Sequence, residues 1–136
     1  MKPEIEKLLV HAFVLPNKRE RVLYELGRAD RREKCMGKLE FWFIPEYMHR
    51  LNGIRSWEIE DNVDAMRALG ARGQAYLMRS EMEECRMMPW EEAVREAADS
   101  ADGFVFISEA MLVYYVGEDY NYTKYCLYSE RLQAGR

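Results

Sequence analysis

"GFVFISEAMLVYYV", residues 103–116, is the stretch of the sequence that decides the fold. It contains two runs, "GFVFIS" and "MLVYYV", that are rich in β-branched and aromatic residues, which favour strands. Two strands this close in the sequence pair as an antiparallel hairpin, because a parallel pair needs a long crossover connection. The stretch therefore predicts a β-hairpin at residues 103–116.

The tyrosines of this region follow the same period of two. Six of the nine tyrosines lie in "YYVGEDYNYTKYCLYSE", residues 114–130. Successive side chains of a strand point to opposite faces, so Tyr114 would share a face with Leu112 while Tyr115 takes the other. A further strand is expected at residues 123–129. A tyrosine ring packs on a half-buried sheet while its hydroxyl reaches water, so we interpret these rings first as the cover of a small sheet.

The alternative interpretation of the tyrosines is a surface that binds another protein, since tyrosine is enriched at the centres of protein interfaces. Stacking on the bases of a nucleic acid is disfavoured, because Glu118, Asp119 and Glu130 flank the run and repel phosphate. The residues expected on a protein-binding surface are Tyr115, Tyr120, Tyr122 and Tyr125.

The N-terminal third of the chain shows apolar residues at helical spacing. The first stripe consists of Ile5, Leu8, Leu9, Ala12 and Phe13. Asn17 is expected to cap a second helix, with Glu20 in the third position of a capping box, and Gly27 is expected to end it. Asp30 would open a third helix. The apolar residues of that helix are Cys35, Met36 and Leu39.

The second half of the chain mixes helices with strands. Residues 60–69 carry a helical stripe, and residues 74–80 have the composition of a strand. "MPWEEAVREAADS", residues 88–100, is the clearest helix, since a proline is tolerated in the first turn and glutamates favour the positive helix end. Trp90 and Val94 are expected to pack this helix on the sheet.

The composition is typical of a single globular domain. A chain of 136 residues that is 49% hydrophobic can bury a core without disulfides. We predict one α+β domain, residues 1–136, with an N-terminal helical cluster and a small, mostly antiparallel C-terminal sheet. No apolar run approaches the roughly 18 residues of a membrane span, and no secretory signal is recognised, so a cytoplasmic protein is expected. The three cysteines form no CxxC pair, which disfavours a disulfide framework and a zinc site.

Positive charge is concentrated in residues 17–38, which hold eight basic and four acidic residues. Residues 1–16 sum to zero and the whole chain to −4, so the remainder carries −8. A basic helical pair could meet an acidic protein, a nucleotide or RNA. The interpretation that we favour is a solvated helix face with local ion pairs, because mixed charge is normal on helices. The residues of the predicted basic patch are Arg28, Arg31, Arg32 and Lys34.

Candidate catalytic groups are isolated in the sequence. Glu60, Asp61 and Asp64 stand near a predicted helix start, where carboxylates could bind Mg²⁺, although acidic residues also favour helix starts. His11 and His49 could act as general bases, but such histidines are more often ordinary structural or surface residues. The sequence contains no phosphate loop and no GxGxxG, GxSxG or HExxH motif. We assign no catalytic residue, no metal site and no cofactor, and favour a noncatalytic role.

Three stretches resemble a group of small uncharacterised bacterial proteins. They are "FVLPNKRERVLYELG" (13–27), "RREKCMGKL" (31–39) and "GFVFISEAMLVYYVGED" (103–119). The last is similar to a closing hairpin of that group, in which the turn tends to carry Pro-Gly where "SEAM" stands here. The resemblance implies an α+β domain in a bacterial or phage setting, and it implies no activity.

Three functional hypotheses follow from these observations. The leading one is a noncatalytic interaction protein, such as an adaptor, inhibitor or immunity-type partner, which binds another protein or a second copy of itself. The second is a nucleic-acid- or nucleotide-binding module that uses the basic helices at residues 18–38. The third is a small metal-dependent hydrolase or nuclease that uses Asp61 and Asp64. No membrane partner is expected.

Overall fold

The computed structural model describes residues 1–51, 59–100, 102–117 and 123–134. The α-helices within these ranges are α1 (Pro3–Phe13), α2 (Arg19–Leu26), α3 (Ala29–Lys38), α4 (Ile59–Ala68), α5 (Trp90–Ser100) and α6 (Glu130–Ala134). Short 3₁₀ turns are η1 (Pro16–Lys18), η2 (Leu39–Trp42), η3 (Pro45–Tyr47) and η4 (Met82–Glu84). The helices lie mainly in the N-terminal part and the strands in the C-terminal part, so the predicted α+β fold class is confirmed.

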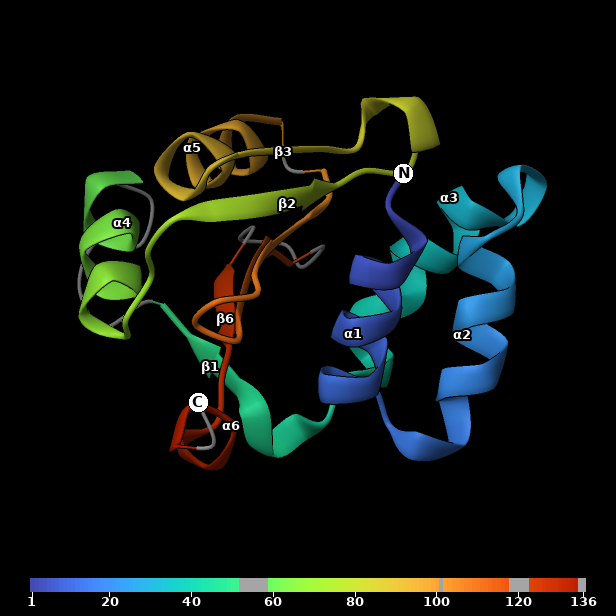
Figure 1. The fold of residues 1–136 in the computed structure, drawn as a ribbon, viewed down its shortest axis with the longest axis horizontal. Coiled ribbons are helices and arrows are strands. Elements are labelled where there is room, and N and C mark those ends of the chain that lie inside the picture. The colour runs from blue at the N-terminus through green and yellow to red at the C-terminus, as the bar shows by residue number, and fades with distance from the viewer. Residues whose placement is uncertain (52–58, 101, 118–122, 135–136) are drawn as a thin grey trace.

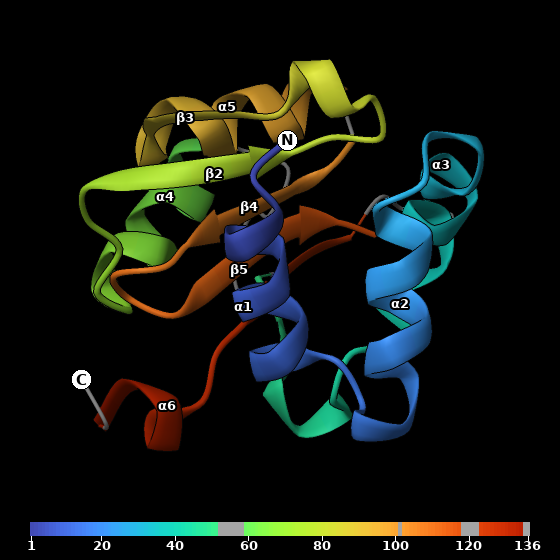
Figure 2. The ribbon, with the colours of Figure 1, turned by 45° about the vertical axis from the view of Figure 1, so that its right-hand side comes forward.

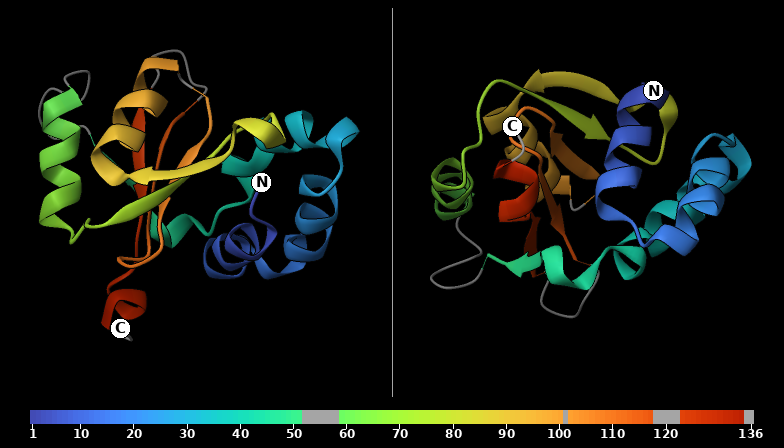
Figure 3. Two further views of the ribbon diagram at one scale, coloured as in Figure 1. Left: turned by 45° about the horizontal axis from the view of Figure 1, so that its top comes forward. Right: turned by 60° about the horizontal axis from the view of Figure 1, so that its bottom comes forward.

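The strands form one antiparallel sheet. Its members are β1 (Met48–Arg50), β2 (Gln74–Met78), β3 (Arg86–Pro89), β4 (Phe104–Ile107), β5 (Leu112–Val116) and β6 (Lys124–Leu127). Their order across the sheet is β1-β6-β5-β4-β2-β3. The first three helices lie on one side of this sheet, and α4 and α5 lie on the other (Figure 1; Figure 3, left).

The predicted hairpin is confirmed at the centre of the sheet. β4 and β5 pair antiparallel, with Phe104 opposite Tyr115 and Ile107 opposite Leu112. The connecting turn includes Met111, whose φ of 51° is unusual for a residue with a side chain. The β-branched and aromatic residues of this stretch therefore form the pleated pair that their composition favours.

Both faces of the hairpin are buried, which corrects the expectation that one face is open. Val113 and Tyr115 face a core shared with α1, α2 and α3. Leu112 and Tyr114 face a second core shared with α4 and α5. Tyr114 is 0% and Tyr115 1% exposed, so the molecule has three layers, with the sheet in the middle. The period of two was predicted correctly, but helices cover each side.

The clearest predicted helix, α5, packs on the sheet as expected. Trp90 and Val94 are buried in the second core with the sheet residues Leu77 and Val105. The helix is shorter than predicted, because Pro89 still belongs to the edge strand β3. Neither β3 nor the opposite edge strand β1 was predicted, since strands of three and four residues are too short to show a period of two.

The predicted capping of α2 is wrong. Pro16–Lys18 form the 3₁₀ turn η1, so α2 begins at Arg19 with Lys18 as its N-cap, and no side chain caps it. The predicted end of this helix is correct, because Gly27 is its C-cap. α3 begins at Ala29, which places Asp30 in its first turn.

Candidate binding groove between two helices

A cavity of about 320 Å³ lies between α2 and α3. The two helices are joined by a tight connection and lie side by side at one end of the molecule (Figures 1 and 2). α3 and the following η2 turn supply most of the lining. The lining residues are Arg21, Glu25, Asp30, Arg31, Lys34, Cys35, Lys38 and Trp42. We call this cavity the basic groove.

The two carboxylates of the basic groove are already paired. Glu25 accepts from the Arg21 guanidinium at 3.4 Å, and Asp30 accepts from Arg28 at 3.3 Å. By contrast Arg31, Lys34 and Lys38 are exposed and have no ion pair with any residue that the structure describes. The groove therefore presents three positive charges that its own carboxylates do not balance. An excess of one sign in a concave site raises the local concentration of oppositely charged ligands.

Trp42 forms the wall at one end of the basic groove. The Arg21 guanidinium lies 5.7 Å and the Lys18 ammonium 5.9 Å from the centre of its ring. Trp42 is partly buried and also packs against the core between the helices and the sheet. These cation–π contacts hold the Lys18 charge beside the groove and fix Arg21, which is paired with Glu25, within it.

Cys35 lies at the base of the basic groove and is buried. Burial raises the pKa of its thiol to about 12, and the charge and hydrogen bond of Glu25 act in the same direction. The sulfur therefore stays a neutral thiol at physiological pH. Since the thiolate is the nucleophile, Cys35 is a packing residue.

Arg32, which was predicted to belong to the basic patch, is instead a core residue. It is 0% exposed, and its guanidinium donates to both carboxylate oxygens of Glu6, at 2.7 and 2.6 Å. It also donates to the carbonyls of Leu26 at 3.0 Å and Arg79 at 2.9 Å. Burial opposes the charge of Arg32, but the Glu6 hydrogen bonds and attraction outweigh it and raise the pKa of the guanidinium. The prediction for Arg32 is therefore wrong, because its charge is used to join α3 to α1.

The other patch residues remain on the surface. Arg28 is exposed, donates to the Tyr24 hydroxyl at 2.9 Å and lies over the Tyr24 ring. Arg31 and Lys34 line the basic groove. Lys38 was not singled out in the predicted patch, although its spacing of four residues from Lys34 places it on the same face of α3. Helical spacing along α3 was the signal that could have found it.

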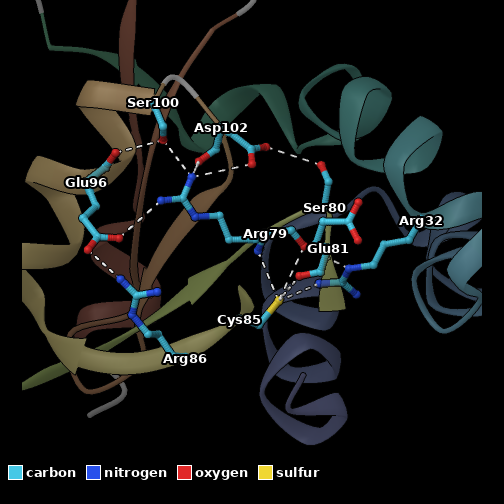
Figure 4. Close-up of polar contacts among 9 residues, drawn as sticks. All are labelled: Arg32, Arg79, Ser80, Glu81, Cys85, Arg86, Glu96, Ser100 and Asp102. Carbon is cyan, nitrogen blue, oxygen red and sulfur yellow. Dashed lines mark hydrogen bonds and ion pairs between the residues drawn. The ribbon is translucent and has the colours of Figure 1, made fainter. Parts of the chain in front are cut away.

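A second polar cluster lies beyond the end of β2 (Figure 4). Arg79 donates to Ser100 at 2.7 Å and to Glu96 at 3.3 Å, which ties β2 to α5. The sulfur of half-buried Cys85 accepts from the Arg32 guanidinium at 3.3 Å and from the Arg79 backbone N–H at 3.2 Å. The cluster unites residues that are far apart in the sequence, so sequence reasoning missed it. Its contacts join structural elements to one another.

A second cavity, of about 250 Å³, lies on another side of α3. Its lining includes the carboxylates Glu33, Glu40 and Asp102 and the rings of Phe104 and Tyr115. We call it the acidic cavity. α3 therefore separates the basic groove from a surface of the opposite charge.

Two of the three carboxylates predicted as a metal site, Glu60 and Asp64 of α4, are engaged in ion pairs. Glu60 accepts from Arg95 at 3.0 Å, and Asp64 accepts from Arg67 at 2.9 Å. Within the described ranges, no three side chains of the types His, Cys, Asp and Glu are grouped so that they could hold a metal ion. Arginines thus hold two of the three predicted carboxylates, Glu60 and Asp64.

The structure describes two of the four residues of the predicted tyrosine surface, Tyr115 and Tyr125. Tyr115 is buried, so the prediction that its ring lies on a surface is wrong, because α1–α3 cover that face. Tyr125 is half-buried and stacks on Tyr115, with ring centres 5.2 Å apart. Tyr120 and Tyr122 lie outside the described residues.

The fold and groove together define an α+β protein of three layers with a basic groove between α2 and α3. Comparison with protein-family models, with curated proteins and with solved structures finds no match for this chain. A search of the described helices finds none with the length and apolar character needed to cross a membrane.

Proposed function

We propose that this protein is a noncatalytic interaction module that binds an anionic partner through the basic groove. The observation that supports this function is the set of three cations, Arg31, Lys34 and Lys38, which converge on one cavity and lack partners among the described residues. Exposed cations held this close repel one another, and a bound anion relieves that repulsion.

The chemistry of the groove supports binding rather than a reaction. Its thiol, Cys35, has a raised pKa and stays protonated. Its carboxylates, Glu25 and Asp30, are already held by arginines. Arginine and lysine side chains at the surface are permanent cations near neutral pH, and they attract an anion without transferring a proton.

The test uses two generic polyanions, poly-L-glutamate and an oligothymidylate, with affinity measured by isothermal titration calorimetry. At least one polyanion should bind at low salt and weaken about tenfold or more between about 50 mM and about 200 mM salt. The triple variant Arg31→Glu, Lys34→Glu, Lys38→Glu should lose this binding. Failure of both polyanions to bind the parent protein at low salt would refute the proposal.

The matched control reverses three cations outside the groove. Lys7, Arg50 and Arg131 are exposed and do not line the cavity. Arg131 lies in α6, far from α2 (Figure 2). The variant Lys7→Glu, Arg50→Glu, Arg131→Glu has the same net charge as the groove variant. Equal loss of binding in both variants would show that net charge, rather than the groove, is responsible.

A further inference from the structure

The cations of the basic groove follow one face of α3 at helical intervals. Arg31, Lys34 and Lys38 are separated by three and four residues, and Trp42 follows four residues later. A helix rises about 1.5 Å per residue, so successive cations lie about 4.5–6 Å apart along the axis. Carboxylates on a partner helix repeat at the same distance when they occur every three or four residues. On a strand, successive side chains of one face are about 6.6 Å apart, so they do not match the spacing of these cations.

The aromatic residue in the lining of the basic groove, Trp42, offers little open surface to a nucleobase. Proteins that hold single-stranded nucleic acid stack its bases on exposed rings. The Trp42 ring is occupied by Lys18 and Arg21 and by the core. The exposed rings of Tyr24 and Phe41 are not part of the groove lining. The lining therefore favours a partner that is held by its charge over one that is held by stacked bases.

The charge beyond the groove also limits the length of an anionic partner. On another side of α3 the acidic cavity presents the exposed carboxylate of Glu33. A nucleic acid strand that continued past the groove would bring its phosphates towards this carboxylate, which repels them over a Debye length of about 8–10 Å. A short acidic segment can end before it meets this carboxylate.

We infer that the occupant of the basic groove is a short acidic helix of a partner protein. This inference rests on the proposed function. The carboxylates of that helix, three or four residues apart, lie opposite Arg31, Lys34 and Lys38. The groove thus recognises the spacing of charges on a helix as well as their sign.

The test uses four probes of similar length: an acidic helical alanine-based peptide, its neutral version, a scrambled peptide of the same charge as the acidic one, and an oligothymidylate. The acidic peptide carries glutamates at positions i, i+3 and i+7, and the neutral version has glutamine at those three positions. We expect the acidic peptide to bind at least about tenfold more tightly than the neutral one. The oligothymidylate should bind no better than the neutral peptide.

A charge exchange tests the pairing itself. Lys34→Glu should weaken binding of the acidic peptide about fivefold to tenfold, and a peptide with lysine at the central position should recover most of that loss with this variant. Arg50→Glu, which changes a cation outside the groove, should leave the affinity unchanged. The same loss in both variants, or no recovery, would overturn the pairing.

The outcomes separate this inference from the proposed function. Tighter binding of the oligothymidylate than of the acidic peptide would overturn the acidic-helix partner while keeping an anion-binding groove. Equal affinity for the acidic peptide and a scrambled peptide of the same charge would overturn the recognition of spacing. If neither anionic probe binds at low salt, both conclusions fail.

Discussion

The buried pair of Arg32 and Glu6 predicts a large loss of stability when one partner is removed. In Arg32→Met most of the side-chain volume stays, but the Glu6 carboxylate loses two hydrogen bonds of 2.7 and 2.6 Å and its counter-charge. The Tyr76 hydroxyl, which donates to Glu6 at 2.6 Å, remains. Glu6 is 2% exposed, so water cannot replace the lost partner.

The expected cost follows from this geometry. Removal of one member of a buried ion pair costs about 3–5 kcal/mol, because it leaves an uncompensated charge in the core. Such a loss is a large part of the roughly 5–15 kcal/mol that stabilises an ordinary domain. The double variant Glu6→Leu, Arg32→Met removes both charges and should be more stable than Arg32→Met alone, although two backbone carbonyls still lose their donor.

The free energy of unfolding, measured by urea titration, checks this prediction. The matched control is Arg31→Met, since Arg31 is the neighbouring arginine on the same helix and is exposed. It should change the free energy of unfolding by less than about 0.5 kcal/mol. The reasoning would be refuted if Arg32→Met cost less than about 1 kcal/mol, or if the double variant were as unstable as the sum of the two single variants.

Three further predictions concern buried hydroxyl and thiol groups. The Tyr114 hydroxyl is buried and meets no hydrogen-bond partner among the described residues, so Tyr114→Phe should be neutral or about 1 kcal/mol stabilising in urea unfolding, whereas Tyr76→Phe should cost about 1.5–3 kcal/mol. Burial raises the pKa of Cys35 to about 12, and the unfolded thiol titrates near about 8.5. Between these values the unfolded chain has lost a proton that the native state keeps, so stability should fall as pH rises, with a smaller slope in Cys35→Ala. Native alkylation followed by mass spectrometry should modify half-buried Cys85 before Cys35 and Cys126, and equal rates for all three would contradict the burial.

The hairpin and α5 could be predicted from the sequence because their signals are local. A run of β-branched and aromatic residues at 104–107 and 112–116 leaves few alternatives to paired strands. The coverage of both sheet faces could not be predicted in the same way. A period of two separates Tyr114 from Tyr115, but it does not show which face meets a helix, and the helices that bury them lie far away in the sequence.

The sequence predicted only part of the basic groove. The predicted patch gathered Arg31, Arg32 and Lys34 because they are neighbours in the chain. Neighbours in a helix point about 100° apart, so adjacent residues do not share a face. The spacing from Arg31 to Lys34 and Lys38 identifies the groove face, and the same spacing excludes Arg32 from it.

The burial of Arg32 could also be predicted from the sequence. The pattern that predicts it is shared by two helices. Arg32 stands three, four and seven residues before buried residues of α3 and the start of η2, and Glu6 stands at the same offsets before those of α1. The buried residues that follow are Cys35, Met36 and Leu39 in the first case and Leu9, Val10 and Phe13 in the second. A charged residue that takes a position in an apolar stripe is buried with it, and a buried charge needs a partner of opposite sign.

These two apolar stripes also explain how a contact in the core orients the cations of the basic groove. The guanidinium of Arg32 is fixed by Glu6 and by the Arg79 carbonyl, and both contacts set the rotation of α3 about its own axis. Residues on a helix are fixed relative to one another, so this rotation also determines where Arg31 and Lys34 point. With Arg32 turned into the core, these two cations face α2, while Glu33 faces the acidic cavity. The separation of positive and negative charge on the two sides of α3 therefore depends on a salt bridge that touches neither surface.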